Sequence, residues 1–361
     1  MTMLGRLWVV SRVLRTAFRA PALSLIVPAF YLPYWCLLRL GIGLDCLLSR
    51  PRGSGSKQTL LLAGAPRSGT TLLHRSLDSV GIGRATQAWE ALLPSAVLQR
   101  LFGPVIRRCA RSLSLAVDLS GAHQARWDLP EADDLGAFSQ HLDSFFFYVY
   151  CLSWDSADHS GYLDAQARPR ALVAREIASL KRAAQRNRIS GSTSIALLKS
   201  FSAGFTLARA SQALEGSRVV YLSRAPHETL PSSLSMVRSM LSRAGLYSRL
   251  GEAERVRHVD RIVDASLALQ LAAIDSLQSL PAERLLIVRY EDLTRNLDTT
   301  LRRVANFVGL PTTQALEDRI RCHVAAERGY RSSHRYSLAD FGLSEPQIRE
   351  RFGVVYEYFN H

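Results

Sequence analysis

Short apolar runs alternate along this chain with longer segments whose apolar residues recur at helical spacing. Runs of strand length cover residues 60–63, 194–198, 218–223 and 285–289, and helical patterns lie on either side of each. Parallel strands need a long crossover between them, and a helix is the usual crossover. The pattern therefore predicts an α/β fold with a central parallel sheet flanked by helices.

The segment between the first two runs, residues 84–190, has a mostly helical pattern interrupted by polar loops. A Gly- and Ser-rich stretch at residues 51–58 is typical of a flexible linker. We therefore expect three parts: an N-terminal segment of residues 1–50, a linker of residues 51–58, and one globular domain over residues 59–361.

The N-terminal segment has the composition of a membrane-associating helical region. Residues 4–19 mix apolar side chains with Arg12, Arg15 and Arg19, which share one face of a helix. Residues 20–38 carry no charge but include Pro28 and Pro33, which are expected to break a helix unless neighbours satisfy the freed backbone groups. We expect monotopic or re-entrant attachment. The alternative is two helices packed on the domain.

The formal net charge of +14 indicates an affinity for anionic nucleotides, membranes or polyanions. The chain shows no zinc-ligand spacing, aromatic RNA-binding motif or basic tail, so no nucleic acid is expected as a partner. Its five cysteines are scattered and form no CxxC pair, which favours a reducing compartment. Together with the N-terminal segment, this predicts a membrane-associated protein whose site faces the cytoplasm.

The first candidate site is the stretch Gly64-Ala65-Pro66-Arg67-Ser68-Gly69-Thr70-Thr71, between an apolar run and a helical segment. Glycines let a backbone curl around an anion, and the N-terminus of the following helix adds unpaired N–H groups. The spacing is that of a P-loop. Thr70, however, stands where the usual Lys follows the second glycine, and the cation comes earlier, at Arg67.

This loop resembles the 5′-phosphosulfate loop of the sulfotransferases, which use 3′-phosphoadenosine 5′-phosphosulfate (PAPS) as the sulfate donor. The resemblance implies that Arg67, Ser68, Gly69, Thr70 and Thr71 hold the 5′-phosphosulfate. Sulfuryl transfer in that family does not depend on a metal, so we expect no metal site.

Two further blocks support the resemblance. Arg224 ends an apolar run, and Ser232 follows eight residues later, as do the family's ligands of the PAPS 3′-phosphate. The block around Tyr290-Glu291-Asp292-Leu293 resembles the family segment whose tyrosine packs against adenine. The resemblance therefore gives that role to Tyr290, although a tyrosine at a strand end is also a common core residue.

The catalytic residues are also inferred from the resemblance. Lys199, one of three lysines in the chain, ends an apolar run and is expected to stabilise charge on the leaving group. Cytosolic relatives have a base two residues later, where this chain has Phe201. Glu90 is therefore our expected acceptor base, as in tyrosylprotein and glycan sulfotransferases. Alternative bases are Glu131, Asp133, Asp134, His141 and His123.

The sequence therefore predicts a PAPS-dependent sulfotransferase that acts on a hydroxyl group. The N-terminal segment suggests a lipid, sterol or glycolipid acceptor. A basic C-terminal loop resembles one that covers the cofactor, and we expect some of Arg331, Ser332 and Arg335 near the nucleotide. Two other functions stay open: a P-loop kinase or NTPase, and a non-catalytic membrane-bound adaptor that retains the nucleotide fold.

Overall fold

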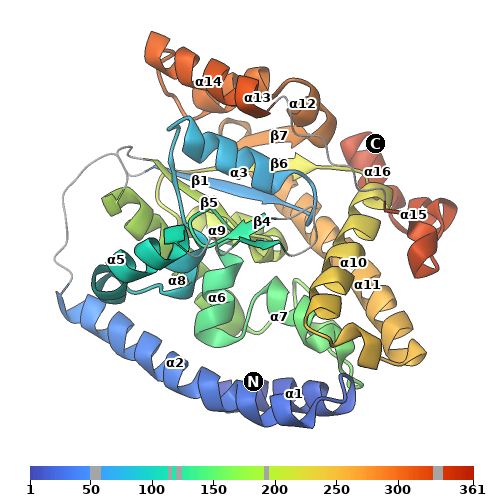
Figure 1. Ribbon diagram of the computed structural model, residues 1–361. Coiled ribbons are helices and arrows are strands. Elements are labelled where there is room, and N and C mark those ends of the chain that lie inside the picture. Colours follow the sequence, from blue (N-terminus) through green and yellow to red (C-terminus); the bar gives the residue numbers. More distant parts are fainter. Residues whose placement is uncertain (49–57, 113–115, 119–123, 191–194, 328–335) are drawn as a thin grey trace.

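A five-stranded parallel sheet forms the centre of the protein in the computed structural model, which describes residues 1–48, 58–112, 116–118, 124–190, 195–327 and 336–361 (Figure 1). The strand order is β2-β5-β1-β6-β7. The strands are β1 (Gln58–Gly64), β2 (Arg84–Ala85), β5 (Ile195–Lys199), β6 (Ser217–Ser223) and β7 (Leu285–Arg289). The predicted α/β class and the four predicted strand positions are confirmed.

Helices cover both faces of this sheet, because β1 is apolar on both sides. Leu60 and Leu62 belong to one hydrophobic cluster with residues of α3 (Thr70–Ser79) and α13 (Leu297–Phe307) on one face. Leu61 and Ala63 belong to the opposite cluster, with α8 (Arg170–Ser190), α9 (Leu207–Ala213) and α11 (Glu252–Ser279). Alternate residues of a strand point to opposite faces, so one run of four apolar residues serves both layers.

The remaining helices surround the carboxyl ends of the strands or extend the two layers. Their bounds are α4 (Ala88–Leu92), α5 (Ala96–Ser112), α6 (Asp134–His141), α7 (Phe145–Tyr150), α10 (Pro226–Arg243), α12 (Tyr290–Arg295), α14 (Gln314–Glu327), α15 (Glu345–Arg351) and α16 (Gly353–Phe359). The sequence analysis did not predict β2 or the antiparallel pair β3 (Ala116–Asp118) and β4 (Gln124–Arg126). Strands of two or three residues are too short to produce an apolar run.

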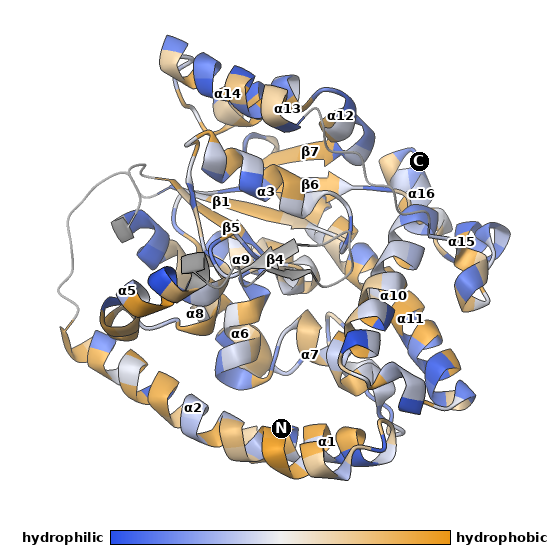
Figure 2. Cartoon of the chain, in the orientation of Figure 1, coloured by the Kyte–Doolittle hydropathy of each residue, from blue (hydrophilic) through white to orange (hydrophobic). Residues whose placement is uncertain are grey.

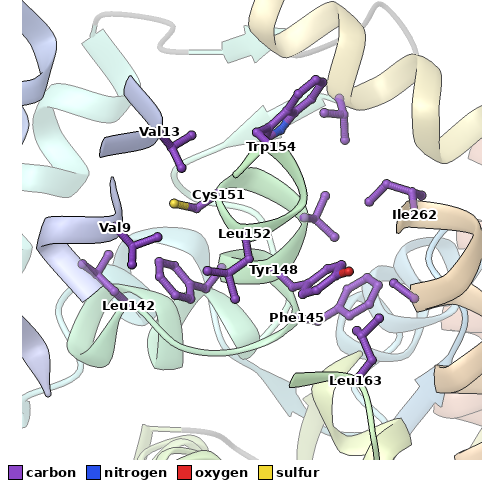
Figure 3. Close-up of a cluster of buried hydrophobic side chains, with 14 of the residues drawn as sticks. Val9, Val13, Leu142, Phe145, Tyr148, Cys151, Leu152, Trp154, Leu163 and Ile262 are labelled. Atoms are coloured by element: carbon purple, nitrogen blue, oxygen red, sulfur yellow. The ribbon is translucent and has the colours of Figure 1, made fainter. Parts of the chain in front are cut away.

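The N-terminal helix α1 (Met3–Thr16) packs on the domain through one apolar face. Val9 and Val13 lie against Cys151 and Leu152 at the end of α7, in a cluster that extends to α11 (Figure 3). The buried Arg6 also forms an ion pair with Asp143 at 3.2 Å. The structure thus shows α1 packed on the domain, which was the alternative to membrane attachment for this helix.

The second helix, α2 (Pro21–Leu48), is continuous through Pro28 and Pro33 and runs along the same side of the domain (Figure 1). The sequence predicts a break at these prolines unless neighbouring groups satisfy the freed carbonyls. A proline at position 28 cannot donate to the carbonyl of Ser24. The hydroxyl of Ser11 in α1 donates to that carbonyl at 2.9 Å instead. The helix also continues ten residues beyond the uncharged stretch recognised in the sequence.

Several predicted features lie outside the described residues. These are most of the linker, the candidate base His123, and the C-terminal loop residues Arg331, Ser332 and Arg335.

Candidate active site

The loop predicted to bind phosphate follows β1 and leads directly into α3. A Cβ atom at Gly64 would lie 2.5 Å from the carbonyl oxygen of Leu222 in β6, so only glycine fits this close approach. Gly69 has a φ of +89° and is the N-cap residue of α3. Arg67 also has a positive φ, +69°, which is uncommon for a residue with a side chain. Backbone strain of this kind often occurs at ligand sites.

Two buried hydroxyl groups at this loop are suited to an anion. Among the described residues, neither the Ser68 hydroxyl in the loop nor the Ser223 hydroxyl at the end of β6 has a hydrogen-bond partner. A buried donor without a partner is costly unless a ligand or water satisfies it. The first N–H groups of α3 lie at the same place, at the positive end of the helix. These groups fit the oxyanions of a phosphosulfate.

The side chains predicted to bind the two ends of one nucleotide are in direct contact. The Arg67 Nε donates to the Ser232 hydroxyl at 2.9 Å. The Arg224 Nη1 donates to the backbone carbonyl of Arg67 at 3.0 Å. Arg224 also forms an ion pair with Glu228 at 2.8 Å. The structure thus brings Arg67, Arg224 and Ser232 to one place, although 165 residues separate the first from the last.

Tyr290 completes this cluster from the neighbouring strand. Ser223 at the end of β6 pairs with Arg289 at the end of β7, so the residues that follow them emerge side by side. The guanidinium carbon of Arg224 lies 3.8 Å from the centroid of the Tyr290 ring. A Cβ atom at Gly69 would lie 2.9 Å from the same ring. A planar aromatic surface therefore borders both the loop and Arg224.

Lys199 reaches the phosphate loop from β5 and is 1% exposed. Its Nζ donates to the Thr71 hydroxyl at 3.0 Å and to the Glu131 carboxylate at 3.1 Å. A buried lysine needs partners of this kind to remain charged. The structure thus places the only cation of β5 next to the last residue of the predicted phosphate loop.

Two further carboxylates, Asp133 and Asp134, follow Glu131 closely in the sequence and bind the backbone around Lys199. Asp133 accepts from the Lys199 backbone N–H at 2.9 Å and from the Thr86 hydroxyl at 2.7 Å. Asp134 accepts from the backbone N–H groups of Phe201 and Ser202 at 2.7 and 2.9 Å. Burial raises the pKa of Asp133 to about 6. Through these contacts, Asp133 and Asp134 hold the end of β5 and thereby position Lys199.

Glu90 lies in α4, which follows the edge strand β2. Its carboxylate accepts from the Arg84 guanidinium at 2.6 Å and from the Gln87 backbone N–H at 2.9 Å. The second bond belongs to a capping box at the start of α4. Glu131, one of the alternative bases, is the carboxylate in contact with Lys199. His141 lies at the end of α6, where its backbone carbonyl accepts from Arg6.

Residues 60–314 of the chain match the sulfotransferase family. The chain belongs to this family. It is an enzyme that transfers sulfuryl groups, and the family in general uses PAPS as donor and a hydroxyl-bearing acceptor. No curated protein sequence matches the chain.

Solved structures support the same fold. The chain is similar to sulfotransferase STF1 from Mycobacterium tuberculosis H37Rv, with a TM-score of 0.66 and 16% identity over 98% of this chain and 92% of that one. It is also similar to sulfotransferase STF9 from Mycobacterium avium, with a TM-score of 0.62 and 16% identity over 84% and 77% of the two chains. The second similarity, like the first, is one of fold.

An aromatic wall beside Lys199 in this sulfotransferase escaped the sequence analysis. It consists of Phe146, Tyr150 and Phe201, whose neighbouring ring centroids lie 5.8 and 6.0 Å apart. The Lys199 Nζ lies 5.8 Å from the Phe201 ring. Burial and the charge of Glu131 raise the pKa of Tyr150, whereas Arg67 lowers it, so this phenol is close to both charges. The only signal in the sequence was the aromatic run at residues 145–148.

Metal ligands are not grouped in the part of the chain that the structure describes. Within it, no group of three or more His, Cys, Asp or Glu side chains is placed to hold a metal ion.

Proposed function

We propose that this sulfotransferase binds PAPS across the carboxyl ends of β1, β6 and β7. The loop residues would hold the 5′-phosphosulfate: Arg67, Ser68, Gly69, Thr70 and Thr71. Arg224 and Ser232 would hold the 3′-phosphate, and Tyr290 would pack against the adenine. Arginine suits phosphate because its planar group donates two parallel hydrogen bonds.

The contact between Arg67 and Ser232 carries this proposal. It joins the loop after β1 to α10, and therefore joins the two anion pockets that one bisphosphorylated adenosine needs. A nucleotide phosphate bound at Arg224 would replace Glu228 as its anionic partner. The partnerless hydroxyls of Ser68 and Ser223 supply further donors at the same place.

The proposed reaction is an in-line sulfuryl transfer. The acceptor oxygen forms a bond to sulfur while the bond from sulfur to the 5′-phosphate oxygen breaks, and the acceptor proton passes to a carboxylate. Lys199, held by Thr71, would stabilise the charge that develops on the leaving oxygen. Glu90 is the proposed base by resemblance, and Glu131 is the competing candidate because it contacts Lys199.

We propose an apolar acceptor that carries a hydroxyl group, such as a lipid, sterol or glycolipid. The aromatic wall of Phe146, Tyr150 and Phe201 supports this, because flat apolar rings beside the transfer site favour a hydrophobic partner. Membrane association through the N-terminal segment, with the site facing the cytoplasm, is part of the same proposal.

The two competing functions make different demands on the site. A P-loop kinase or NTPase needs the Lys that follows the second glycine, and Thr70 stands there. An adaptor without activity needs no base beside the transfer site. The contact of Glu131 with Lys199 favours an enzyme over such an adaptor.

Calorimetry with adenosine 3′,5′-bisphosphate tests the proposal. The parent chain should bind it, and Arg224→Ala should weaken binding by about 2–3 kcal/mol, or roughly 30- to 150-fold. Arg284→Ala removes the same charge at the opposite end of β7 and should leave the affinity unchanged. Unchanged affinity in Arg224→Ala would contradict the assigned 3′-phosphate site, and tighter binding of ATP with Mg²⁺ would contradict PAPS as the donor.

A further inference from the structure

Figure 2 shows that α1 and α2 consist mostly of hydrophobic residues. Many of their apolar side chains are exposed, which is the reverse of an ordinary helix on a soluble domain. On α2, exposed apolar side chains recur at intervals of three, four and seven residues. Phe30 is 77% exposed and Leu47 is 83% exposed. We call this surface the outer face; it consists of Leu4, Trp8, Leu25, Ile26, Phe30, Leu37, Leu40, Leu47 and Leu48.

The polar side chains of α2 point the other way, into the domain. The Tyr31 and Tyr34 hydroxyls donate to backbone carbonyls in α6 and α4, at 2.9 and 2.6 Å. The Asp45 carboxylate accepts two backbone N–H groups from the first turn of α5, both at 2.8 Å. Such contacts fix which stripe of α2 is buried, because each satisfies a polar group at the interface.

These contacts also fix the direction of the helix. They extend from Ser24 to Asp45, which covers most of a helix that is about 42 Å long at 1.5 Å per residue. By length and composition alone, α2 could cross a membrane. A crossing would remove the helix from the domain and expose every one of these polar groups to hydrocarbon. The docked helix instead lies flat along one side of the protein (Figure 1).

The charges around the outer face select the kind of surface that it fits. Residues 1–48 contain five arginines and a single acid, Asp45, which is engaged in capping α5. Arg15 and Arg39 are exposed, and the guanidinium of Arg39 lies 5.9 Å from the Trp35 ring. Basic residues with exposed tryptophan and leucine are typical of helices in an anionic membrane interface. A second copy of the chain would bring the same positive charges together.

We propose that the outer face binds one leaflet of an anionic membrane, with α2 in the plane of the interface and the sheet domain outside the hydrocarbon. α6 and α7 lie between the sheet and this helix pair (Figure 1). The aromatic wall belongs to the same continuous hydrophobic cluster that α1 and α2 contact. This inference rests on the membrane association proposed above and specifies its surface and geometry, whereas the nucleotide site does not depend on it.

Co-sedimentation of the full chain with vesicles tests this surface. We expect binding to vesicles of phosphatidylcholine with 30% phosphatidylglycerol, and weaker binding to phosphatidylcholine alone. Phe30→Asp with Leu40→Asp should reduce binding at least tenfold, and Arg39→Gln should reduce it roughly fivefold. Val354→Asp changes a valine on α16 that is 59% exposed, close to the 63% of Leu40, and should have no effect. Equal loss in Val354→Asp, or full binding by the Phe30/Leu40 variant, would overturn the proposal.

A disulfide that fixes α2 to the domain distinguishes binding in the plane of the membrane from insertion of α2 across the membrane. A Cβ atom at Gly41 would lie 2.8 Å from the Ser95 hydroxyl oxygen but only 2.6 Å from the Leu98 side chain. Gly41→Cys with Ser95→Cys, made together with Leu98→Ala to remove this clash, therefore joins α2 to the segment before α5. Binding should be the same for the oxidised and the reduced protein. Binding that disappears on oxidation and returns on reduction would show that α2 must leave the domain, which contradicts the in-plane arrangement.

Two controls distinguish this proposal from the others. Adenosine 3′,5′-bisphosphate binding by each variant reports an intact fold and does not depend on lipid, so failure at the outer face leaves the nucleotide proposal untouched. Sedimentation velocity without vesicles should show the same oligomeric state for the parent chain and for the variant with Phe30→Asp and Leu40→Asp. The proposal thus expects no self-association through the outer face. Such an association without vesicle binding would assign the face to a second copy and overturn the membrane proposal.

Discussion

The guanidinium of Arg224 lies over the Tyr290 ring, with its central carbon 3.8 Å from the ring centroid. The two residues follow paired positions of β6 and β7, and the parallel register brings them together. Contact with an aromatic face holds an arginine in place while its N–H groups remain available on its edge. Arg224 is therefore oriented in advance of any ligand.

The first prediction concerns Gly69, whose missing side chain makes room for that ring. Gly69→Ala should lower the free energy of unfolding by about 1–2 kcal/mol because of its positive φ. It should also weaken adenosine 3′,5′-bisphosphate binding, since the new Cβ atom would displace Tyr290.

Gly342→Ala is the matched control. Gly342 has a φ of +70°, and no atom of the described residues lies within 4 Å of the position that a Cβ atom would take. Denaturant unfolding should show a similar loss of stability, whereas calorimetry should show unchanged affinity. An equal loss of affinity in both variants would mean that Tyr290 is not the cause.

The second prediction concerns Lys199. Lys199→Met should lower kcat by a factor of about 10²–10³, the effect of removing one group that stabilises transition-state charge. Lys199→Arg should restore part of the activity because it keeps the charge. Lys181→Met removes an exposed lysine of α8 and should leave kcat unchanged. Steady-state turnover of PAPS gives the measurement, and full activity in Lys199→Met would remove the leaving-group assignment.

The third prediction identifies the base. Glu90→Gln should lower kcat for the turnover of PAPS by a factor of about 10²–10⁴, because an amide cannot take the proton of the acceptor. Glutamine keeps an oxygen that can accept from Gln87 or Arg84, so thermal unfolding should change little. If Glu131→Gln has this effect and Glu90→Gln does not, the base is Glu131. An unchanged kcat in both variants would contradict both assignments.

The fourth prediction is a pH dependence of stability. Burial raises the pKa of Asp133 from 3.8 to about 6, so the folded state holds this proton more tightly than the unfolded state. The stabilisation is complete below about pH 3.8 and is lost as the pH rises through 6. Asp133→Asn should therefore flatten the fall in unfolding free energy between pH 4 and 6.

Glu176 provides the comparison for this prediction. Burial raises its pKa to about 7, although two hydrogen bonds from Arg168 oppose the shift. Glu176→Gln should flatten the fall in unfolding free energy over a pH range that extends up to pH 7. Urea unfolding at a series of pH values measures both slopes. An unchanged slope between pH 4 and 6 in Asp133→Asn would mean that Asp133 is already ionised there.

Much of the fold was predictable because its signals are local. The strands β1, β5, β6 and β7 are continuous apolar runs, and the loop after β1 needs glycine where the backbone approaches β6 and where α3 begins. These requirements concern neighbouring residues, so the sequence contains them directly. The strand β2 gave no such signal, because two residues at a sheet edge form no pattern.

The helix α2 shows where local reasoning was insufficient. Pro28 removes a donor within its own helix, and the replacement donor is Ser11 of another helix. A prediction based on α2 alone must therefore expect a break. Similarly, Glu90 and Glu131 have the same chemistry, and only the folded chain puts Glu131 in contact with Lys199.

By itself, the sequence determined the parallel sheet and the glycine-containing loop after its first strand, and it predicted the residue types able to hold two anions. The tertiary structure decided which of these residues meet: Arg67 with Ser232, Arg224 with Tyr290, and Lys199 with Glu131. It also decided which stripe of α2 faces outward. Both stripes of that helix are apolar enough to be buried, so hydropathy cannot choose between them. The choice depends on the distant carbonyl and N–H groups that Tyr31, Tyr34 and Asp45 satisfy.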